Sequence, residues 1–262
     1  MKTNRMMFPL LAVLIACFYL GACSKSNNNS NSNTAQMTMR LTDDPGNFDA
    51  VYVDIQQVGF TVSGHSEIML TPQRKGVYNL LSFRNGLDTL LVNASVPAGT
   101  VGQIRLVLGS NNSVVVGGVS YPLSTPSAQE SGLKLNFQTT LAANTAYTIW
   151  IDFDAGKSIL QTGGGSYKLK PVIRAYSALT NGEIAGYVFP SVALATVYAI
   201  NGTDTAAAIP NSSDGHFVIG GLAAGSYQLV VSPAAAGFLS FSTSVNVSFG
   251  VVADVGTITL HP

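Results

Sequence analysis

The feature that most constrains the fold of this chain is a strict alternation of apolar and polar residues, which recurs after residue 36. The clearest example is the segment 147–154, YTIWIDFD, in which every second side chain is aromatic or aliphatic. A period of two is typical of a strand with one buried face, whereas a helix shows apolar residues three to four apart. No sustained helical period follows residue 36, and only 10% of the residues are charged. The sequence therefore predicts an all-β fold.

Turn signals divide the β-rich part of the chain into two regions. We expect residues 36–179 to form a larger β-sandwich domain. Residues 180–262 hold six or seven short alternating segments within about 80 residues, which favours a small Greek-key β-sandwich of the immunoglobulin-like kind. Both domains would follow an N-terminal segment of different character.

Some local expectations are sharper. Asp43-Asp44-Pro45-Gly46 is typical of a turn, and a short helix is expected around Leu80–Phe83. That helix should stop at Asn85-Gly86, because this pair favours positive φ angles. Segments 114–121 and 167–176 are each expected to be one strand.

The first 35 residues predict a targeting segment and a tether. Lys2 and Arg5 precede an apolar run, Met6–Leu20, which is shorter than the roughly 20 residues that a membrane span needs. The run ends in Leu20-Gly21-Ala22-Cys23, and this arrangement resembles a bacterial lipoprotein signal. The resemblance implies cleavage before Cys23, a diacylglyceryl group on its thiol, and a flexible polar tether over residues 23–35.

The same resemblance implies a location. Residues 1–22 would be removed, and the lipid on Cys23 would hold the protein on a membrane. Ser24 follows the cysteine where an aspartate would favour retention at the inner membrane, so the resemblance implies the outer membrane of a bacterial cell. Whether the protein faces the periplasm or the outside stays open.

Signal removal would also bound the chemistry of the mature chain. The chain has two cysteines, Cys17 in the signal and Cys23 at the lipid, so the domains would hold no thiol for a disulfide, a zinc site or a nucleophile. The signal carries two of the 13 basic residues and none of the 13 acidic ones, which leaves a balance of 11 − 13 = −2. This balance argues against nucleic acid as a partner.

Four stretches of the second region form a recognisable set: Gly182–Val188 (GEIAGYV), Asp214–Ile219 (DGHFVI), Gly221–Tyr227 (GLAAGSY) and Ile258–Leu260 (ITL). With them the region resembles the carboxypeptidase regulatory-like, or transthyretin-like, domain. The resemblance implies a seven-stranded β-sandwich that serves as an accessory or spacer module and carries no catalytic site.

The first region contains, in order, the stretches Leu41–Pro45 (LTDDP), Val51–Ile55 (VYVDI), Pro97–Thr100 (PAGT), Gln103–Leu106 (QIRL), Asp152–Ser158 (DFDAGKS) and Tyr167–Arg174 (YKLKPVIR). With them it resembles the DUF4382 type of domain found in bacterial surface lipoproteins. This resemblance implies a fold and an envelope location and brings no activity.

Catalytic patterns are weak throughout the chain. The three histidines are His65, His216 and His261, and none has the separate orienting carboxylate that a Ser-His-Asp triad requires. Gly163-Gly164-Gly165 is followed by no Lys-Ser or Lys-Thr and by no helix, so we interpret it as a hairpin tip and not a phosphate loop. The sequence therefore predicts a protein that is not an enzyme.

The acidic residues leave two interpretations open. Asp43, Asp44 and Asp49 lie within seven residues, and hard oxygen ligands of this kind could hold Ca²⁺, although the spacing matches no EF-hand loop. Alternatively, Asp43 caps the turn through its own backbone. A glycosidase pair would need these residues to lie near Asp152 and Asp154, which nothing in the sequence indicates.

Trp150, Asp152 and Asp154 share the polar face of the strand 147–154, opposite its apolar face. A solvent-facing tryptophan beside two carboxylates would suit a sugar, which stacks on the ring and forms hydrogen bonds to the acids. Alternatively, Trp150 packs under a loop or against the second region.

Together these features favour a nonenzymatic cell-envelope lipoprotein that presents a binding or adhesive surface. Its partners would be the membrane, through the lipid, and a glycan or an envelope or host protein. The alternative is a structural or assembly subunit that engages a protein partner through exposed edge strands.

Overall fold

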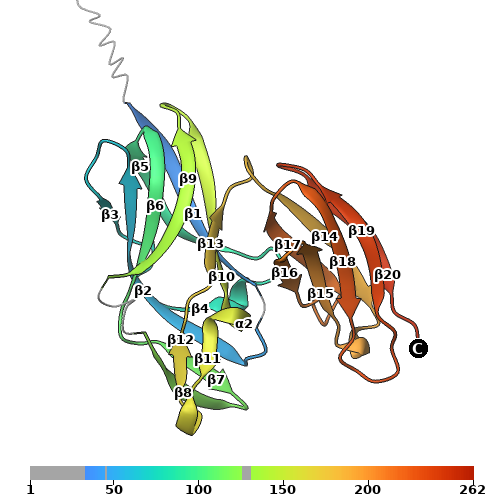
Figure 1. The fold of residues 1–262 in the computed structure, drawn as a ribbon. Helices are drawn as coiled ribbons and strands as arrows, with labels where there is room; N and C mark the ends of the chain where they lie inside the picture. The colour runs from blue at the N-terminus through green and yellow to red at the C-terminus, as the bar shows by residue number, and fades with distance from the viewer. Residues whose placement is uncertain (1–32, 45, 126–130) are drawn as a thin grey trace, which may run out of the picture. The chain divides into compact units, whose positions relative to one another are not determined.

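The computed structural model describes residues 33–44, 46–125 and 131–262 (Figure 1). The fold is almost entirely β, with its strands arranged in four sheets, and this confirms the all-β prediction. The predicted signal, Cys23 and all but the end of the tether lie outside the described residues. Within the described residues, no helix has the length and hydropathy that crossing a membrane requires.

The first sandwich consists of a four-stranded and a nine-stranded sheet. The four-stranded sheet has the order β13-β10-β1-β5, with β1 at Thr34–Asp44, β5 at Thr89–Pro97, β10 at Ala146–Asp154 and β13 at Ile173–Tyr176. The nine-stranded sheet contains β2 (Ala50–Val62), β3 (Ile68–Leu70), β4 (Gly76–Asn79), β6 (Gly99–Leu108), β7 (Ser113–Val116), β8 (Val119–Ser124), β9 (Leu133–Leu141), β11 (Ile159–Gln161) and β12 (Tyr167–Leu169). Three short helical turns lie between strands: η1 (Leu80–Phe83), α2 (Ala155–Ser158) and η2 (Gly163–Gly165).

The alternation noted in the sequence builds the core of this sandwich. Ile149, Ile151 and Phe153 of β10 are buried, as are Met37 and Leu41 of β1. They belong to one hydrophobic cluster that includes residues from both sheets. Burial of such side chains stabilises the fold by about 1.5–3 kcal/mol each.

The pairing of β1 with β10 positions the site described below. The two strands are parallel, with Thr42 opposite Asp152 and Asp44 opposite Asp154. Because parallel strands end at the same edge of a sheet, Asp43 and Asp44 meet Asp152 and Asp154 there. The pairing joins segments more than 100 residues apart, which no local pattern predicts.

The second sandwich packs a three-stranded sheet, β17-β14-β20, against a four-stranded sheet, β16-β15-β18-β19 (orange to red in Figure 1). Its elements are β14 (Gly182–Phe189), η3 (Ser191–Ala193), β15 (Thr196–Asn201), β16 (Asp204–Ala208), β17 (His216–Leu222), β18 (Gly225–Ser232), β19 (Phe241–Val247) and β20 (Val252–Thr259). It has a hydrophobic core of its own, centred on residues such as Ile184, Phe217 and Leu229. Residues 33–262 nevertheless form one compact unit, so the division into domains at residues 179 and 180 stays a prediction.

Local expectations were confirmed at one helix and wrong at two strands. η1 spans the expected Leu80–Phe83, and Asn85 and Gly86 have the expected positive φ angles of 56° and 76°. The segment 114–121 is a hairpin, because Gly117 and Gly118 reverse the chain with φ angles of 58° and 76°. The segment 167–176 is divided around Pro171 into β12 and β13, which lie in different sheets.

The acidic turn was also wrong in part. Asp43 and Asp44 are the last residues of β1, so they belong to a strand and not to a turn. The strands β3, β4, β5, β11 and β16 were not predicted, because they are short or their apolar residues do not alternate clearly over enough positions.

Candidate functional site

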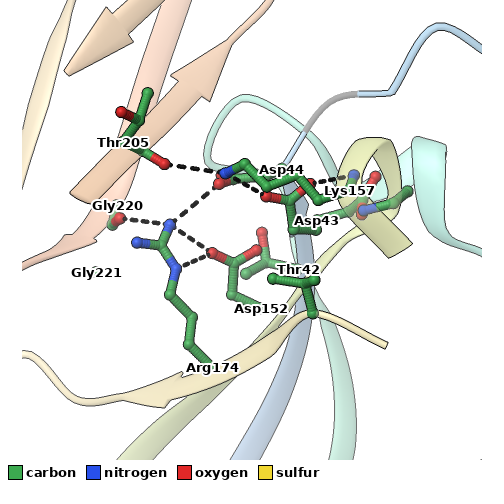
Figure 2. A network of polar contacts seen from close by, with 12 residues as sticks. Thr42, Asp43, Asp44, Asp152, Lys157, Arg174, Thr205, Gly220 and Gly221 are labelled. Atoms are coloured by element: carbon green, nitrogen blue, oxygen red, sulfur yellow. Dashed lines mark hydrogen bonds and ion pairs between the residues drawn. The ribbon is translucent and has the colours of Figure 1, made fainter. Parts of the chain in front are cut away.

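The most distinctive polar site lies where β1 and β10 end, and Arg174 of β13 organises it. Arg174 is opposite Asp152 in the antiparallel β10–β13 pair, and its Nε and Nη2 both contact Asp152 Oδ2 at 2.6 Å. Its Nη2 also contacts Asp44 Oδ2 at 3.3 Å. One guanidinium therefore binds two carboxylates from neighbouring parallel strands (Figure 2).

Arg174 and Lys157 also connect this edge to the second sandwich. Arg174 Nη2 donates to the carbonyl oxygen of Gly220 at 3.3 Å, and Lys157 Nζ donates to that of Thr205 at 3.0 Å (Figure 2). Lys157 is held in place by an ion pair with Asp154, whose carboxylate also accepts the Lys157 backbone N–H. Arg174 thus binds two carboxylates of the first sandwich and Lys157 binds one, and each cation also binds one carbonyl of the second sandwich.

Two asparagines add hydrogen bonds of the same kind. Asn181 Nδ2 donates to the Gly221 carbonyl at 2.9 Å, and Asn85 Nδ2 donates to the Ile209 carbonyl at 2.7 Å. Residues 182–262 contain four acidic residues and no lysine or arginine. The charged donors at the junction therefore come from the first sandwich, while the second supplies main-chain acceptors.

Burial shapes the electrostatics of the acidic residues. It raises the pKa of Asp43 well above its ordinary value, and it raises the pKa of Asp44 to about 8, with the negative charge of Asp152 adding to the effect. The pKa of Asp152 is raised as well, because its burial outweighs the attraction of Arg174. This cluster therefore favours the uptake of positive charge, as protons or as a cation.

A cleft of about 360 Å³ opens beside the network. Its polar lining includes Asp154, Lys157, Arg174 and Asp204, and its apolar lining includes Tyr227. Cationic donors and carboxylate acceptors beside an aromatic and aliphatic wall are typical of a site for a small polar molecule.

The structure places the three residues of the predicted sugar site differently from one another. Asp152 and Asp154 line the cleft, but Asp152 is only 3% exposed, so the expected solvent-facing patch is wrong at that position. Trp150 stacks on Tyr176 and donates its indole N–H to Asp88 Oδ2 at 2.8 Å. Trp150 lines a small cavity together with residues of the second sandwich, including Val252. This placement matches the alternative interpretation, in which Trp150 packs against the second region. Ligand binding by these three residues stays a prediction.

The predicted calcium residues do not assemble as a group. Asp43 is 4% exposed and accepts the Ala155 N–H at 3.0 Å. The prediction that it caps the turn through its own backbone is therefore wrong. Asp49 accepts the Gly118 N–H at 2.8 Å and takes no part in the network. Across the described ranges, no group of three or more histidine, cysteine, aspartate or glutamate side chains is arranged to hold a metal ion. Asp43, Asp44 and Asp49 therefore do not form the calcium site that their spacing suggested.

No sequence pattern pointed to Arg174, Lys157 or Asn85 as functional residues. Arg174 and Lys157 did lie in the motifs YKLKPVIR and DFDAGKS, and the second motif also contains Asp154, the ion-pair partner of Lys157. Their function in the network depends on the register of β13 and on contacts with a distant region, and neither is visible in a local pattern.

Comparison with known proteins identifies the first region. Residues 34–171 match the family model described as domain of unknown function DUF4382. No curated protein sequence matches the chain. The second region has the seven strands that a carboxypeptidase regulatory-like domain would have, but its membership of that family stays a prediction.

Similarity to solved structures is low. A cohesin–X-dockerin complex from Acetivibrio cellulolyticus is 24% identical over 30% of this chain and 56% of that chain, with a TM-score of 0.24. A minor pilin of Streptococcus agalactiae is 12% identical over 86% of this chain and 95% of that one, with a TM-score of 0.23. A fimbrial protein from Bacteroides ovatus is 8% identical over 87% of this chain and 50% of that one, with a TM-score of 0.29.

The chain thus spans only about half the length of the first and the last of these proteins. At these scores the likenesses say nothing about activity or partners. The family match is of a different kind, because it covers more than half of the 262 residues and includes β1 with Asp44, β10 with Asp152 and α2 with Lys157. The chain belongs to the DUF4382 family.

Proposed function

We propose that this protein is a nonenzymatic cell-envelope lipoprotein that binds a saccharide in the cleft beside Arg174. The observation that carries the proposal is the composition of that cleft. Lys157 and Arg174 offer N–H donors, Asp154 and Asp204 offer acceptors, and Tyr227 contributes to an apolar wall. Sugars present both hydroxyl groups and apolar ring faces, so they match a lining of this kind.

The network supports binding more than catalysis. Glycoside hydrolysis needs two carboxyl groups that flank the scissile bond. Asp152 is buried and bound by Arg174, so it is poorly placed to act on a substrate in the cleft. His65 and His261 are exposed, and His216 packs against the Tyr187 ring.

A glycan screen of the full chain, purified in detergent, tests this proposal. Asp204 is exposed and lines the cleft, whereas Asp214 is exposed in a turn of the same sandwich and does not. We expect Asp204→Ala to weaken saccharide binding at least fivefold and Asp214→Ala, which removes the same charge, to leave it unchanged. If the folded protein bound no glycan in the screen, the proposal that it binds a saccharide would be wrong.

The envelope location is supported by residues 1–35 of the sequence. An apolar run that ends in Leu20-Gly21-Ala22-Cys23, followed by a serine- and asparagine-rich tether, is what a lipoprotein needs to hold folded domains away from a membrane. A lipid on Cys23 would place the binding cleft within reach of envelope polysaccharides.

A second candidate function is assembly through an edge strand. β19 is the last strand of its sheet, and Phe241 at its start is 38% exposed. An uncovered edge can accept a strand from a partner. In sedimentation measurements, an assembly subunit would form concentration-dependent oligomers that Phe241→Lys removes. Phe249→Lys, which changes an exposed aromatic residue outside β19, would serve as the matched control.

A further inference from the structure

A second, smaller cavity shares Asp44 and Asp152 with the lining of the cleft, and three buried side-chain oxygens of its lining residues have no hydrogen-bond partner among the described residues. Its volume is about 40 Å³. Residues of the first sandwich, including Asp43, Asn85 and Asp152, line one side, and residues of the second sandwich, including Glu183 and Gly220, line the other. A cavity needs roughly 10–15 Å³ to hold one water molecule, so this one has room for an ion with a few waters.

Three buried side-chain oxygens at this cavity have no hydrogen-bond donor among the described residues. They are Asp43 Oδ2, Asn85 Oδ1 and Asp152 Oδ1. Within the described ranges these are the only buried side-chain nitrogen or oxygen atoms without a partner, and all three belong to residues that line this cavity. A buried polar atom without a hydrogen-bond partner destabilises a fold, so three on residues that line one cavity call for a binding partner.

The orientation of each side chain is fixed by its other polar atom. Asp43 Oδ1 accepts the Ala155 N–H, and Asp152 Oδ2 accepts from Arg174. Asn85 Nδ2 donates to the Ile209 carbonyl, and since a carbonyl can only accept, the amide cannot be reversed. Asn85 Oδ1 is therefore an acceptor, and the free oxygens of Asp43 and Asp152 are acceptors when their carboxyl groups are ionised, so all three can bind a cation in place of protons. Figure 2 shows Asp43, Asp44 and Asp152 close together at this edge.

The charge balance around the cavity points the same way. Five acidic residues line it, and no lysine, arginine or histidine does. They are Asp43, Asp44, Asp88, Asp152 and Glu183. Two arginines offset part of this charge from outside the lining, Arg40 by pairing with Asp88 and Arg174 by pairing with Asp44 and Asp152. A net negative charge held out of water is costly unless protons or a cation neutralise it.

We infer that this cavity binds a hard metal cation, best matched by Ca²⁺, through Asp43, Asn85 and Asp152. Carboxylate and amide oxygens are ligands that Ca²⁺ prefers, and its flexible coordination tolerates water molecules at the remaining positions. The volume excludes larger organic cations. The site differs from the sequence-predicted set, because Asp49 is absent from it and two of its ligands come from β10 and from the loop after η1. It shares Asp44 and Asp152 with the lining of the saccharide cleft, whereas Asp43 and Asn85 line the smaller cavity and not the cleft, so variants of these two residues test the cation site apart from saccharide binding.

The only tryptophan of the chain provides a direct probe. Trp150 lines the same cavity. Tb³⁺ substitutes for Ca²⁺ in oxygen sites, and its luminescence is sensitised only by an excited ring close to it. We expect the full chain, stripped with chelator and excited selectively at tryptophan, to sensitise Tb³⁺ luminescence, and we expect Ca²⁺ to displace the Tb³⁺. Trp150→Phe should abolish the emission while calorimetry still detects Ca²⁺ binding.

Three further variants separate this site from other acidic positions. Asp43→Asn and Asn85→Ala should each weaken Ca²⁺ binding at least tenfold, and neither removes a partner of Arg174. Asp49→Asn, which changes an exposed carboxylate outside the cavity, should bind as the parent does. Circular dichroism would establish that each variant is folded. The inference would be overturned if the folded parent gave neither sensitised emission nor binding heat, or if both Asp43→Asn and Asn85→Ala kept the parental affinity.

Discussion

Trp150 stacks on Tyr176, with ring centroids 5.7 Å apart and ring planes 12° apart, and the two residues are directly opposite each other in the β10–β13 pair. Tyr176 is 9% exposed, and its ring also lies against the main chain of Gly220 and Gly221 in the second sandwich. This stack therefore connects the end of the first sandwich to β17. The predictions that follow test how far the junction contributes to stability.

Gly221→Ala should destabilise the protein by more than 2 kcal/mol, measured by urea unfolding. Gly221 has a φ of +69°, and a Cβ there would lie 2.6 Å from the Tyr176 ring. The left-handed conformation alone costs an alanine about 1 kcal/mol, and the clash adds to this. Gly256 is the matched control, because its φ is +67° and no atom lies within 4 Å of an added Cβ. Equal losses from Gly221→Ala and Gly256→Ala would show that the packing of Tyr176 on β17 is not tight.

Trp150→Ala should lower the free energy of unfolding by about 2 kcal/mol, because it removes both the stack on Tyr176 and the hydrogen bond to Asp88. Trp150→Phe keeps an aromatic ring and loses only the N–H donor, so its loss should be about 1 kcal/mol. Thermal unfolding followed by circular dichroism measures both. If Trp150→Ala abolished saccharide binding without affecting stability, the ring would be part of a sugar site after all.

Arg174→Met should destabilise the protein by about 2 kcal/mol, since it leaves the carboxyl groups of Asp152 and Asp44 buried without their cation. The arginine side chain is 37% exposed, which places the loss below that of a fully buried ion pair. Arg174→Lys keeps the charge but cannot reproduce the fork that contacts Asp152, Asp44 and the Gly220 carbonyl, so it should recover only part of the loss. Full recovery by lysine would mean that charge alone matters here.

Cys23→Ala should move the protein from the membrane fraction to the soluble fraction of its host cells. The prediction follows from the lipoprotein signal and from the roughly 0.8 kcal/mol that each buried CH₂ of an acyl chain contributes. Intact mass of the parent protein would show the lipid on a chain that begins at Cys23. A mass equal to the unmodified polypeptide would contradict the proposed anchor.

Much of the secondary structure could be predicted because it depends on local pattern. The alternation in β10 correctly separated Ile149, Ile151 and Phe153 from Trp150 and Asp152. The preference of Asn85-Gly86 for positive φ correctly predicted that the short helix before this pair ends there. The alternation in 114–121 predicted a single strand, but Gly117 and Gly118 form the turn of a hairpin within it. An alternating pattern on both sides of a two-residue turn looks the same as one continuous strand.

The polar site could be predicted from the sequence less completely than the strands could. Sequence analysis identified Asp43, Asp44, Asp152 and Asp154 as candidates but kept them as two separate groups. Their meeting depends on the parallel pairing of β1 and β10. Asp49 is closer in sequence to Asp43 than Asp152 and Asp154 are, yet it lies elsewhere in the fold, where its carboxylate accepts the Gly118 N–H.

The sequence by itself determined the class of fold, the family and the residue types available for chemistry, because alternation, turn residues and motifs are local properties. Only the tertiary structure decided which of those residues act together. Asp152 is the clearest case: its position on the polar face of a strand suggested exposure to solvent, yet it is 3% exposed and bound to Arg174. Burial and long-range pairing depend on how distant strands and the second sandwich pack over that face, and a one-dimensional pattern carries no information about what covers it.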